Sequence, residues 1–307
     1  MEKSKVFHEI SHWMYRNARP IDLARWQYHY ENGERNNVLR SLLAYQNEDG
    51  GFGHALEADC WNRESSPIQT WKACEILQEI DCPREHPIVG KVIAYLQNTS
   101  HFNGGFWLAQ IHSNNDYPRA PWWTFTDGDN AVWGYNPTAA LAGFVLVYGN
   151  REQLFYQTAT RIAEEAFDHY LKSTSISDDM HELSSYIRLL DCLKRSGLPF
   201  KHEGEIQEKL QRNVSHLIEK DRSQWGLRYC TMPSQFIDGP ANIFFLQNEQ
   251  VVEEELNYLL DNRESGGVWS VPWEWGMYER EFSVSENWWR ADLALSYTKL
   301  LHSFGRI

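Results

Sequence analysis

The sequence predicts an all-α protein, built as five or six helical hairpins in an (α/α)5–6 barrel. Three observations carry this prediction. A Gly-Gly-aromatic unit occurs three times, each time after a segment with helical spacing of its apolar residues. Apolar residues recur at intervals of three and four through most of the chain, and the alternation typical of strands is nearly absent. Such a repeat indicates an array of stacked supersecondary units.

The repeated unit spans residues 46–52, 97–107 and 262–269, and a degenerate copy at 221–226 lacks one glycine. In each copy a helix end is followed by backbone that glycine adopts at little cost, and the aromatic residue then returns to pack on a neighbouring repeat. We expect Gly51 and Gly105 to take positive φ, so that valine at either position destabilises the fold.

Apolar spacing, prolines and N-cap residues predict a series of helices along the chain. Val6–Asn17 and Ile21–Tyr30 form two short amphipathic helices that are broken at Pro20. Pro67 begins an inner helix with Ser66 as its N-cap, because proline suits the first helical position. Further helices are expected at Val38–Gln46, Pro67–Ile80, Pro87–Asn98, Pro137–Tyr148, Glu152–Leu171, Asp179–Ser196, Glu203–Glu219, Pro240–Leu246, Gln250–Asn262 and Ser285–Ser303.

Three loops interrupt this alternation of helices, and we expect the chemistry of the protein there. They cover residues 54–65, 107–135 and 270–286, and the last two are long and rich in tryptophan and acidic residues. Loops above about 15 residues in a compact domain are usually functional. Carboxyl groups opposite aromatic walls have environments that can shift their pKa, as acid and base catalysis requires.

Composition limits the class of protein. The 307 residues contain no Pro/Gly/Ser-rich linker, so we expect a single domain covering residues 1–307. With 14 Trp, 15 Tyr and 14 Phe, the apolar volume is concentrated in rings, which a wide aromatic-lined cavity would explain. A formal charge of -13 disfavours nucleic acid and anionic membranes as partners, because both are recognised by clustered Lys and Arg.

The chain begins with a mixed polar segment and has no long uncharged apolar stretch. We therefore expect a soluble, cytoplasmic protein without stable membrane insertion. Its five cysteines are an odd number without CxxC spacing, which favours reduced thiols over a disulfide framework. The oligomeric state is left open.

The repeated unit resembles the QW motifs of the terpenoid cyclase and protein prenyltransferase superfamily, whose members form a toroid of inner and outer helices. The stretch GGFGHALEAD at residues 50–59 is similar to the signature of a family of uncharacterised bacterial proteins described as prenyltransferase-like or squalene-cyclase-like. This resemblance implies an α/α toroid that handles an isoprenoid substrate.

The segment Phe125–Val132 resembles the Asp-x-Asp-Asp acid motif of protonation-initiated terpenoid cyclases, with Asn130 in place of the third Asp. The resemblance implies that Asp129 donates the initiating proton to an alkene or epoxide. Such a carboxyl group must be kept protonated, and Asp127 together with nearby tryptophans could supply that environment. A turn is the alternative interpretation, because Asp, Gly and Asn all tolerate left-handed backbone.

Two further groups of residues offer other chemistry. His54, Glu57 and Asp59 are catalytic candidates, and the two acids could equally hold their loop through backbone N–H groups. In the third loop, the carboxylates in Glu274–Glu281 suit a paired acid and base acting on a glycosidic bond. Aromatic rings there would stabilise carbocations or stack on sugars, with packing between repeats as the alternative. The expected substrate-binding residues are Trp61, Trp107, Trp122, Trp123, Trp133, Trp273, Trp275, Glu274, Trp289 and Arg290.

No metal or other cofactor is expected. The run Asp178–Glu182 looks like an aspartate-rich magnesium motif, but serines precede it at a helix start, where acids serve as N-cap and as partners of the helix dipole. The histidines lack HExxH spacing, and the segment Trp288–Leu293 contains neither Cys nor His. Zinc-dependent chemistry is therefore not expected.

The leading hypothesis from the sequence is an isoprenoid-handling enzyme that resembles a class II terpenoid cyclase and uses Asp129 as its acid. The alternative enzyme is a carbohydrate lyase or glycoside hydrolase, because a mean hydropathy of -0.58 fits a polar substrate better. A non-catalytic ligand-binding toroid is the third possibility. Fold alone does not decide among these three.

Overall fold

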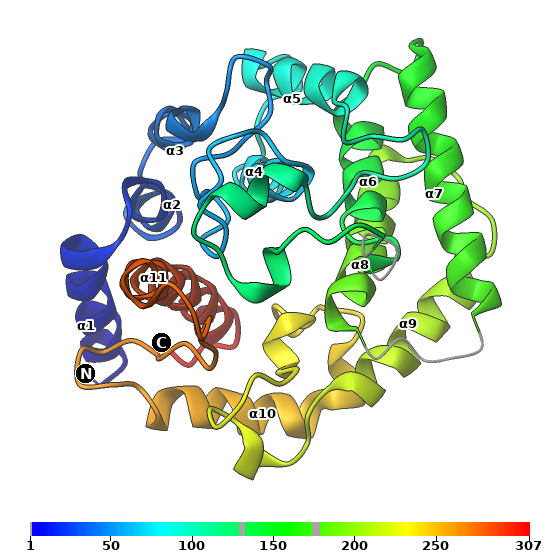
Figure 1. Cartoon of the computed structure of the whole chain (residues 1–307). Helices are drawn as coiled ribbons and strands as arrows, with labels where there is room; N and C mark the ends of the chain where they lie inside the picture. Colours follow the sequence, from blue (N-terminus) through cyan, green and yellow to red (C-terminus); the bar gives the residue numbers. More distant parts are fainter. Residues whose placement is uncertain (1, 129–132, 174–178) are drawn as a thin grey trace. The chain divides into compact units, whose positions relative to one another are not determined.

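The structure is a computed structural model that describes residues 2–128, 133–173 and 179–307 (Figure 1). These residues form α-helices joined by loops and short 3₁₀ helices, and among them there is no β-strand. Isolated β-bridges pair Gln46 with Phe52, Cys60 with Arg119, and Phe102 with Trp107. The expected all-α class is confirmed, and the closed toroid stays a prediction.

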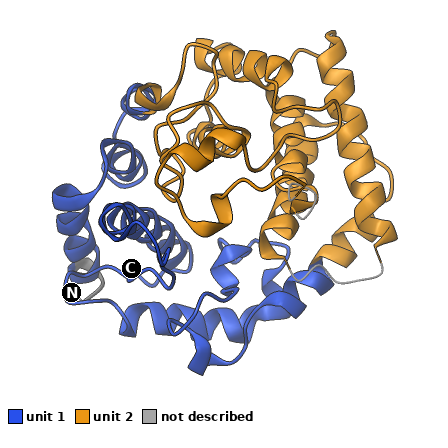
Figure 2. Ribbon diagram, in the orientation of Figure 1, with its two compact units in different colours: residues 1–41, 211–307 blue, residues 42–210 orange. Residues whose placement is uncertain are grey.

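The chain divides into two compact units, which Figure 2 colours separately. Unit 2 covers residues 42–210, and unit 1 covers residues 1–41 and 211–307. The α9 helix (Glu203–Leu217) contributes residues to both units.

Unit 2 is organised around the α6 helix (Thr138–Tyr148), which is buried along nearly its whole length because its side chains are small or apolar. It packs against α4 (Pro67–Glu79), α5 (Pro87–Asn98), α7 (Leu154–Lys172) and α8 (Met180–Ser196). A helix that is apolar on every side is a core helix, and α6 forms the centre of this unit.

Unit 1 contains α1 (Glu2–Asn17), α2 (Pro20–Tyr30), α3 (Arg35–Leu42, whose last residue falls in unit 2), α10 (Phe245–Asp261) and α11 (Glu279–Ser303). The long α11 helix packs against α1 and α2, and α10 packs against the 3₁₀ helix η6 (Pro233–Gln235). No helix in the described part of the chain combines the length and apolar composition that crossing a membrane requires.

Helix starts follow the capping signals of the sequence. Ser66 accepts a hydrogen bond from the Gln69 backbone N–H and caps α4, and Asp179 accepts hydrogen bonds from the first turn of α8. The expected separate short helix at 240–246 is wrong, because residues 240–244 form turns and Phe245 begins the longer α10 helix. The α11 helix begins at Glu279, six residues earlier than predicted, with two acids in a first turn that favours negative charge.

The repeated turns depend on one glycine each, and in two copies it is not the expected one. Gly50, Gly104 and Gly267 have φ values of +90°, +93° and +90°, whereas Gly51 and Gly105 do not take positive φ. An added Cβ at Gly51 would still lie 2.6 Å from Ser65, but at Gly105 its nearest neighbour would be 3.8 Å away. The predicted strain at Gly51 and Gly105 is therefore wrong in its cause, and at Gly105 an added Cβ meets no obstacle.

In two copies of the repeated turn, a tryptophan is hydrogen-bonded to the helix that precedes it. The Trp107 indole donates to the Leu96 carbonyl at the end of α5, and the Trp269 indole donates to the Leu259 carbonyl at the end of α10. These bonds use carbonyl groups in the last turn of each helix. Such tryptophans hold a turn against its own helix.

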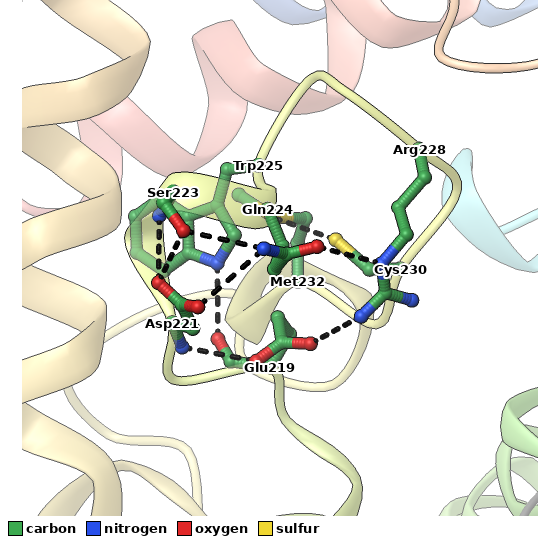
Figure 3. A network of polar contacts seen from close by, with 8 residues as sticks. All are labelled: Glu219, Asp221, Ser223, Gln224, Trp225, Arg228, Cys230 and Met232. Atoms are coloured by element: carbon green, nitrogen blue, oxygen red, sulfur yellow. Dashed lines mark hydrogen bonds and ion pairs between the residues drawn. The ribbon is translucent and has the colours of Figure 1, made fainter.

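The degenerate copy in unit 1 keeps this bond although it has lost one glycine (Figure 3). The Trp225 indole donates to the Glu219 carbonyl at 3.0 Å, just after α9. Around it, Arg228 forms an ion pair with the Glu219 carboxylate at 2.7 Å, and Gly226 takes a φ of +76°. A polar network thus surrounds the tryptophan where the other copies have two glycines.

Candidate functional site

The residues expected at a functional site belong to both units. Unit 2 holds His54, Glu57, Asp59, Trp61, Trp107, Trp122, Trp123, Asp127 and Trp133. Unit 1 holds Trp273, Glu274, Trp275, Trp289 and Arg290. Asp129, the expected proton donor, lies outside the described residues. Each set is therefore described within its own unit.

The loop that carries the unit 2 acids has an unusual backbone at its start. His54 and Ala55 have φ values of 60° and 61°, so two consecutive residues with a Cβ adopt the left-handed region. Each such residue costs of order 1 kcal/mol and persists where the surrounding structure enforces it. The His54 imidazole lies 2.9 Å from the Asn47 side-chain oxygen, and its backbone N–H donates to the Asn62 carbonyl.

Three fully buried amide side chains enforce this shape. Gln69, on α4, accepts from the Leu56 N–H and donates to the Asn62 carbonyl. The Asn62 side chain donates to Ser113 and to Asn114, both at 2.9 Å, and so joins this loop to residues 107–135. Buried amides hydrogen-bonded in this way rigidify the loops that they connect.

Glu57 and Asp59 are the buried acids of this loop. Their exposed fractions are 9% and 3%, respectively. The Glu57 carboxylate accepts the backbone N–H of Asp59 at 2.9 Å, and the Asp59 carbonyl accepts the N–H of Ala120 at 2.8 Å. Acidic side chains are rarely this buried unless they are paired or have a chemical role. The hydrogen bond from the Asp59 N–H supports the interpretation that Glu57 holds the loop. A catalytic role of Glu57 is compatible with this bond.

A short antiparallel contact brings the second loop beside these acids. Cys60 and Arg119 form an isolated bridge, flanked by the bond from Ala120 to Asp59 and by a bond from the Trp61 N–H to the Pro118 carbonyl at 3.0 Å. Residues directly opposite each other in such a pair place their side chains on the same face. The Arg119 side chain therefore lies on the same side as the Cys60 thiol.

The charges around Cys60 describe the electrostatics of the site. The pKa of the Cys60 thiol is raised to about 12, chiefly by burial; the charges of Glu57 and Asp59 also raise it, whereas the Asn62 backbone and the Arg119 charge lower it. The thiol thus stays protonated at neutral pH and is not a nucleophile. All three charges affect the pKa of the Cys60 thiol. Glu57, Asp59 and Arg119 therefore lie in one small region of unit 2.

Tryptophans of the second loop stand next to this region. Trp123 and Trp133 stack with ring centroids 5.2 Å apart and an angle of 7° between the rings. Their indole N–H groups are buried and make no hydrogen bond with described residues. Trp122 is 36% exposed, and its carbonyl accepts a hydrogen bond from Gln110. Trp122 is thus partly accessible to solvent.

Two predicted residues of unit 2 have other positions. Trp107 is buried against Phe102, with ring centroids 4.4 Å apart, and its indole N–H serves the α5 helix end. Asp127 is exposed and precedes Gly128, which takes a φ of +90°. Trp107 is therefore a packing residue, and Asp127 lies in a turn, as the alternative interpretation of its motif anticipates.

The unit 1 set consists of packed rings and an ion pair. Trp273 lies edge-on to Tyr229 and to Trp289, with centroids 5.5 Å and 5.3 Å away. Arg290 pairs with Glu264. The remaining members differ in exposure: Trp275 is buried against Phe282, and Glu274 is exposed. The acids Glu279 and Glu281, predicted in a loop, lie in the first turn of α11.

Unit 1 also contains an acid that the sequence analysis does not single out. Glu255 is fully buried on α10, where its carboxylate accepts hydrogen bonds from the backbone and hydroxyl of Ser234 at 2.8 Å and 2.5 Å. Burial raises the pKa of Glu255 to about 7, although the two bonds from Ser234 lower it. Its position on the apolar stripe with Val251, Val252 and Leu259 is the signal that could have revealed it. The hydrogen bonds of Glu255 with Ser234 thus connect η6 to α10.

Among the described residues, no three His, Cys, Asp or Glu side chains are placed to hold a metal ion. The predicted N-cap role of Asp179 is confirmed by its bond from the His181 N–H at 2.7 Å. Comparison of the chain with protein-family models, with curated proteins and with solved structures finds no match. The candidate site is therefore interpreted from its own geometry.

Arg119 is the main residue of the unit 2 site that the sequence analysis misses. It is the only Lys or Arg in residues 107–135, which contain three Asp. A lone basic residue between two prolines of an acidic, tryptophan-rich loop is a signal that could have found it. We define the candidate site as Glu57, Asp59, Trp61, Arg119 and Trp122.

Proposed function

We propose that the chain is an enzyme that acts on a carbohydrate, with Glu57 and Asp59 supplying acid and base chemistry at a glycosidic bond. One observation carries the proposal: two buried carboxyl groups, two residues apart, lie on a loop whose strained backbone is held by buried amides. Cleavage of a glycosidic bond uses two carboxyl groups in different protonation states.

The proposed reaction requires one of the two acids to be protonated and the other to be ionised. A carboxyl group that burial keeps protonated gives its proton to the leaving glycosidic oxygen. The other, as carboxylate, accepts a proton from water in hydrolysis or from a sugar carbon in elimination. Trp122 and the half-buried Trp61 offer ring faces on which sugars stack. The low mean hydropathy of the chain fits such a polar substrate.

The isoprenoid hypothesis is the second candidate, and the stack of Trp123 and Trp133 favours it. Aromatic faces attract cations, so such a pair would stabilise a carbocation formed beside it. Its acid would be Asp129, which lies outside the described residues. This candidate therefore depends on a resemblance, whereas the carbohydrate proposal depends on described side chains.

Incubation of the purified chain with neutral and acidic oligosaccharides, prenyl diphosphates and polyprenols tests both candidates. We expect cleavage of a saccharide, followed as new reducing ends or as the ultraviolet absorbance of an unsaturated product. Glu57→Gln and Asp59→Asn should each lower kcat by about 10²- to 10⁴-fold, the usual contribution of general acid or base catalysis. Asp127→Asn, an exposed acid of the same unit, is the matched control and should retain activity.

A different pattern would refute the carbohydrate proposal. If a prenyl substrate is converted, Asp129→Asn abolishes that conversion, and Glu57→Gln and Asp59→Asn remain fully active, the cyclase candidate replaces it. Circular dichroism and melting of each variant distinguish lost chemistry from lost folding.

A further inference from the structure

Arg119 is buried and firmly held. Its side chain is 8% exposed, its Nε–H donates to the Thr124 hydroxyl at 3.1 Å, and one Nη donates to the carbonyls of Asn115 and Tyr117 at 3.2 Å and 3.0 Å. Three neutral acceptors therefore fix the guanidinium. The orientation of Arg119 does not depend on a carboxylate.

No ion pair neutralises this guanidinium within the described part of the chain. None of its hydrogen bonds goes to an acid, and no carboxylate of the described residues lies within 4.0 Å of its nitrogens. Its second Nη makes no hydrogen bond to a described residue. Buried charges in proteins are normally paired, because the loss of hydration is expensive. A buried, oriented arginine that has no ionic partner among the described residues can serve as a recognition group for an anion.

The place of Arg119 connects it to the acids. Its bridge with Cys60 puts both side chains on one face, and the Glu57 and Arg119 charges act in opposite directions on the same thiol. An anion held by Arg119 would therefore lie near the loop that carries Glu57 and Asp59, the candidate acid and base. This is the arrangement required when the anion belongs to the molecule that reacts.

We propose that Arg119 binds the carboxylate of an acidic sugar, so that the substrate is a uronate-containing saccharide. The inference rests on the proposed function. The guanidinium fork matches a planar carboxylate, and its hydrogen bonds to an anion are stronger than neutral ones. A single positive charge beside two acids suits a singly charged group, whereas a diphosphate would meet stronger repulsion from Glu57 and Asp59.

Binding measurements test this assignment without reference to turnover. Isothermal titration with digalacturonate, its methyl ester and inorganic pyrophosphate compares a carboxylate, its neutral counterpart and a diphosphate. We expect digalacturonate to bind about 10- to 100-fold tighter than the ester. Arg119→Gln should reduce its affinity to that of the ester, and Arg119→Lys, which keeps the charge but loses the fork, should give an intermediate value. Melting temperatures of both variants confirm that they are folded.

Equal affinity for digalacturonate and its ester, tighter binding of pyrophosphate, or unchanged digalacturonate affinity in a folded Arg119→Gln variant would each overturn the inference. Failure of the proposed function looks different. Carboxylate binding that depends on Arg119, without cleavage of any saccharide, keeps this inference and removes the enzyme assignment. Cleavage restricted to neutral saccharides, unaffected by Arg119→Gln, keeps the enzyme and removes the inference.

Discussion

Unit 1 holds two buried arginines and unit 2 holds one, and the three differ in what faces the guanidinium. In unit 1, Arg19 pairs with Asp22 at 2.7 Å, and Arg25 pairs with Asp22 at 3.4 Å and with Asp292 at 2.7 Å. The pair of Arg25 with Asp292 thus joins α2 to α11, and the two pairs with Asp22 lie at the start of α2. Within the described part of the chain, Arg119 of unit 2 donates to neutral oxygens and to no carboxylate.

The difference separates a structural use of buried charge from a functional one. In the unit 1 cluster each positive charge has a negative partner, so the fold itself supplies the compensation. In unit 2 the fold orients the Arg119 charge through neutral acceptors, and no described carboxylate pairs with it. Removing an arginine should therefore have opposite consequences for stability and for binding in the two units.

The largest effect is expected for Arg25→Gln in unit 1. The variant leaves Asp22, which is 1% exposed, and Asp292 without one of their cations, and breaking a buried pair costs about 3–5 kcal/mol. Urea unfolding followed by circular dichroism measures the loss. Arg195→Gln, which breaks an exposed pair with Asp81, is the control and should cost about 0–1 kcal/mol. Equal losses in the two variants would contradict the structural role assigned to the cluster.

The next effect concerns Glu255, the buried acid whose hydrogen-bond partners the fold supplies. Its folded pKa of about 7 exceeds the ordinary value of 4.5, so the folded state binds a proton more tightly than the unfolded state. This stabilisation is complete below about pH 4.5 and is lost as the pH rises through 7, with an amplitude of order 3 kcal/mol.

Glu255→Gln isolates this contribution, because the amide cannot titrate. The difference in unfolding free energy between variant and wild type should change between pH 4.5 and 8 in the direction of a relatively more stable variant at high pH. Urea titrations at several pH values measure it. A difference that stays constant with pH would show that Glu255 titrates as an ordinary acid.

A smaller effect is expected where the repeated turn anchors the candidate loop of unit 2. Gly50 has a φ of +90°, and an added Cβ would lie 2.3 Å from the Lys91 carbonyl oxygen, so Gly50→Ala should cost about 1–3 kcal/mol. Gly105→Ala, with ordinary φ and open space, should be close to neutral. Thermal melting compares the two. A neutral Gly50→Ala would mean that this turn is not what fixes the loop.

Local chemistry explains which parts of the fold the sequence predicts. The cap at Ser66, the proline starts of α4 and α5 and the all-α class follow from signals within a few residues. The start of α10 does not, because Phe245 is fixed by packing on Phe304, which lies near the end of the chain. Which of two adjacent glycines takes positive φ depends on the turn that the backbone forms. The sequence does not distinguish the two glycines, so it does not predict which one does.

The sequence predicts the loop that carries Glu57 and Asp59, but it does not predict that Arg119 lies beside this loop. Glu57 and Asp59 stand in a sequence that draws attention, and both are buried. Arg119 lies 60 residues beyond Asp59 in the numbering and reaches it through one backbone bridge, which no local pattern encodes. Trp107, also predicted to bind substrate, is buried, and its indole N–H bonds to the Leu96 carbonyl.

The smallest change in stability is expected for Arg119→Gln in unit 2, in contrast to Arg25→Gln in unit 1. The substitution loses hydrogen bonds to Thr124 and to two carbonyls, each worth about 1 kcal/mol, but it also removes a buried charge that no described carboxylate pairs with. These terms oppose each other, so the unfolding free energy should change by less than about 1 kcal/mol. Urea unfolding beside Arg25→Gln makes the test direct. A loss as large as that of Arg25→Gln would mean that Arg119 serves the fold in the same way as the arginines of unit 1.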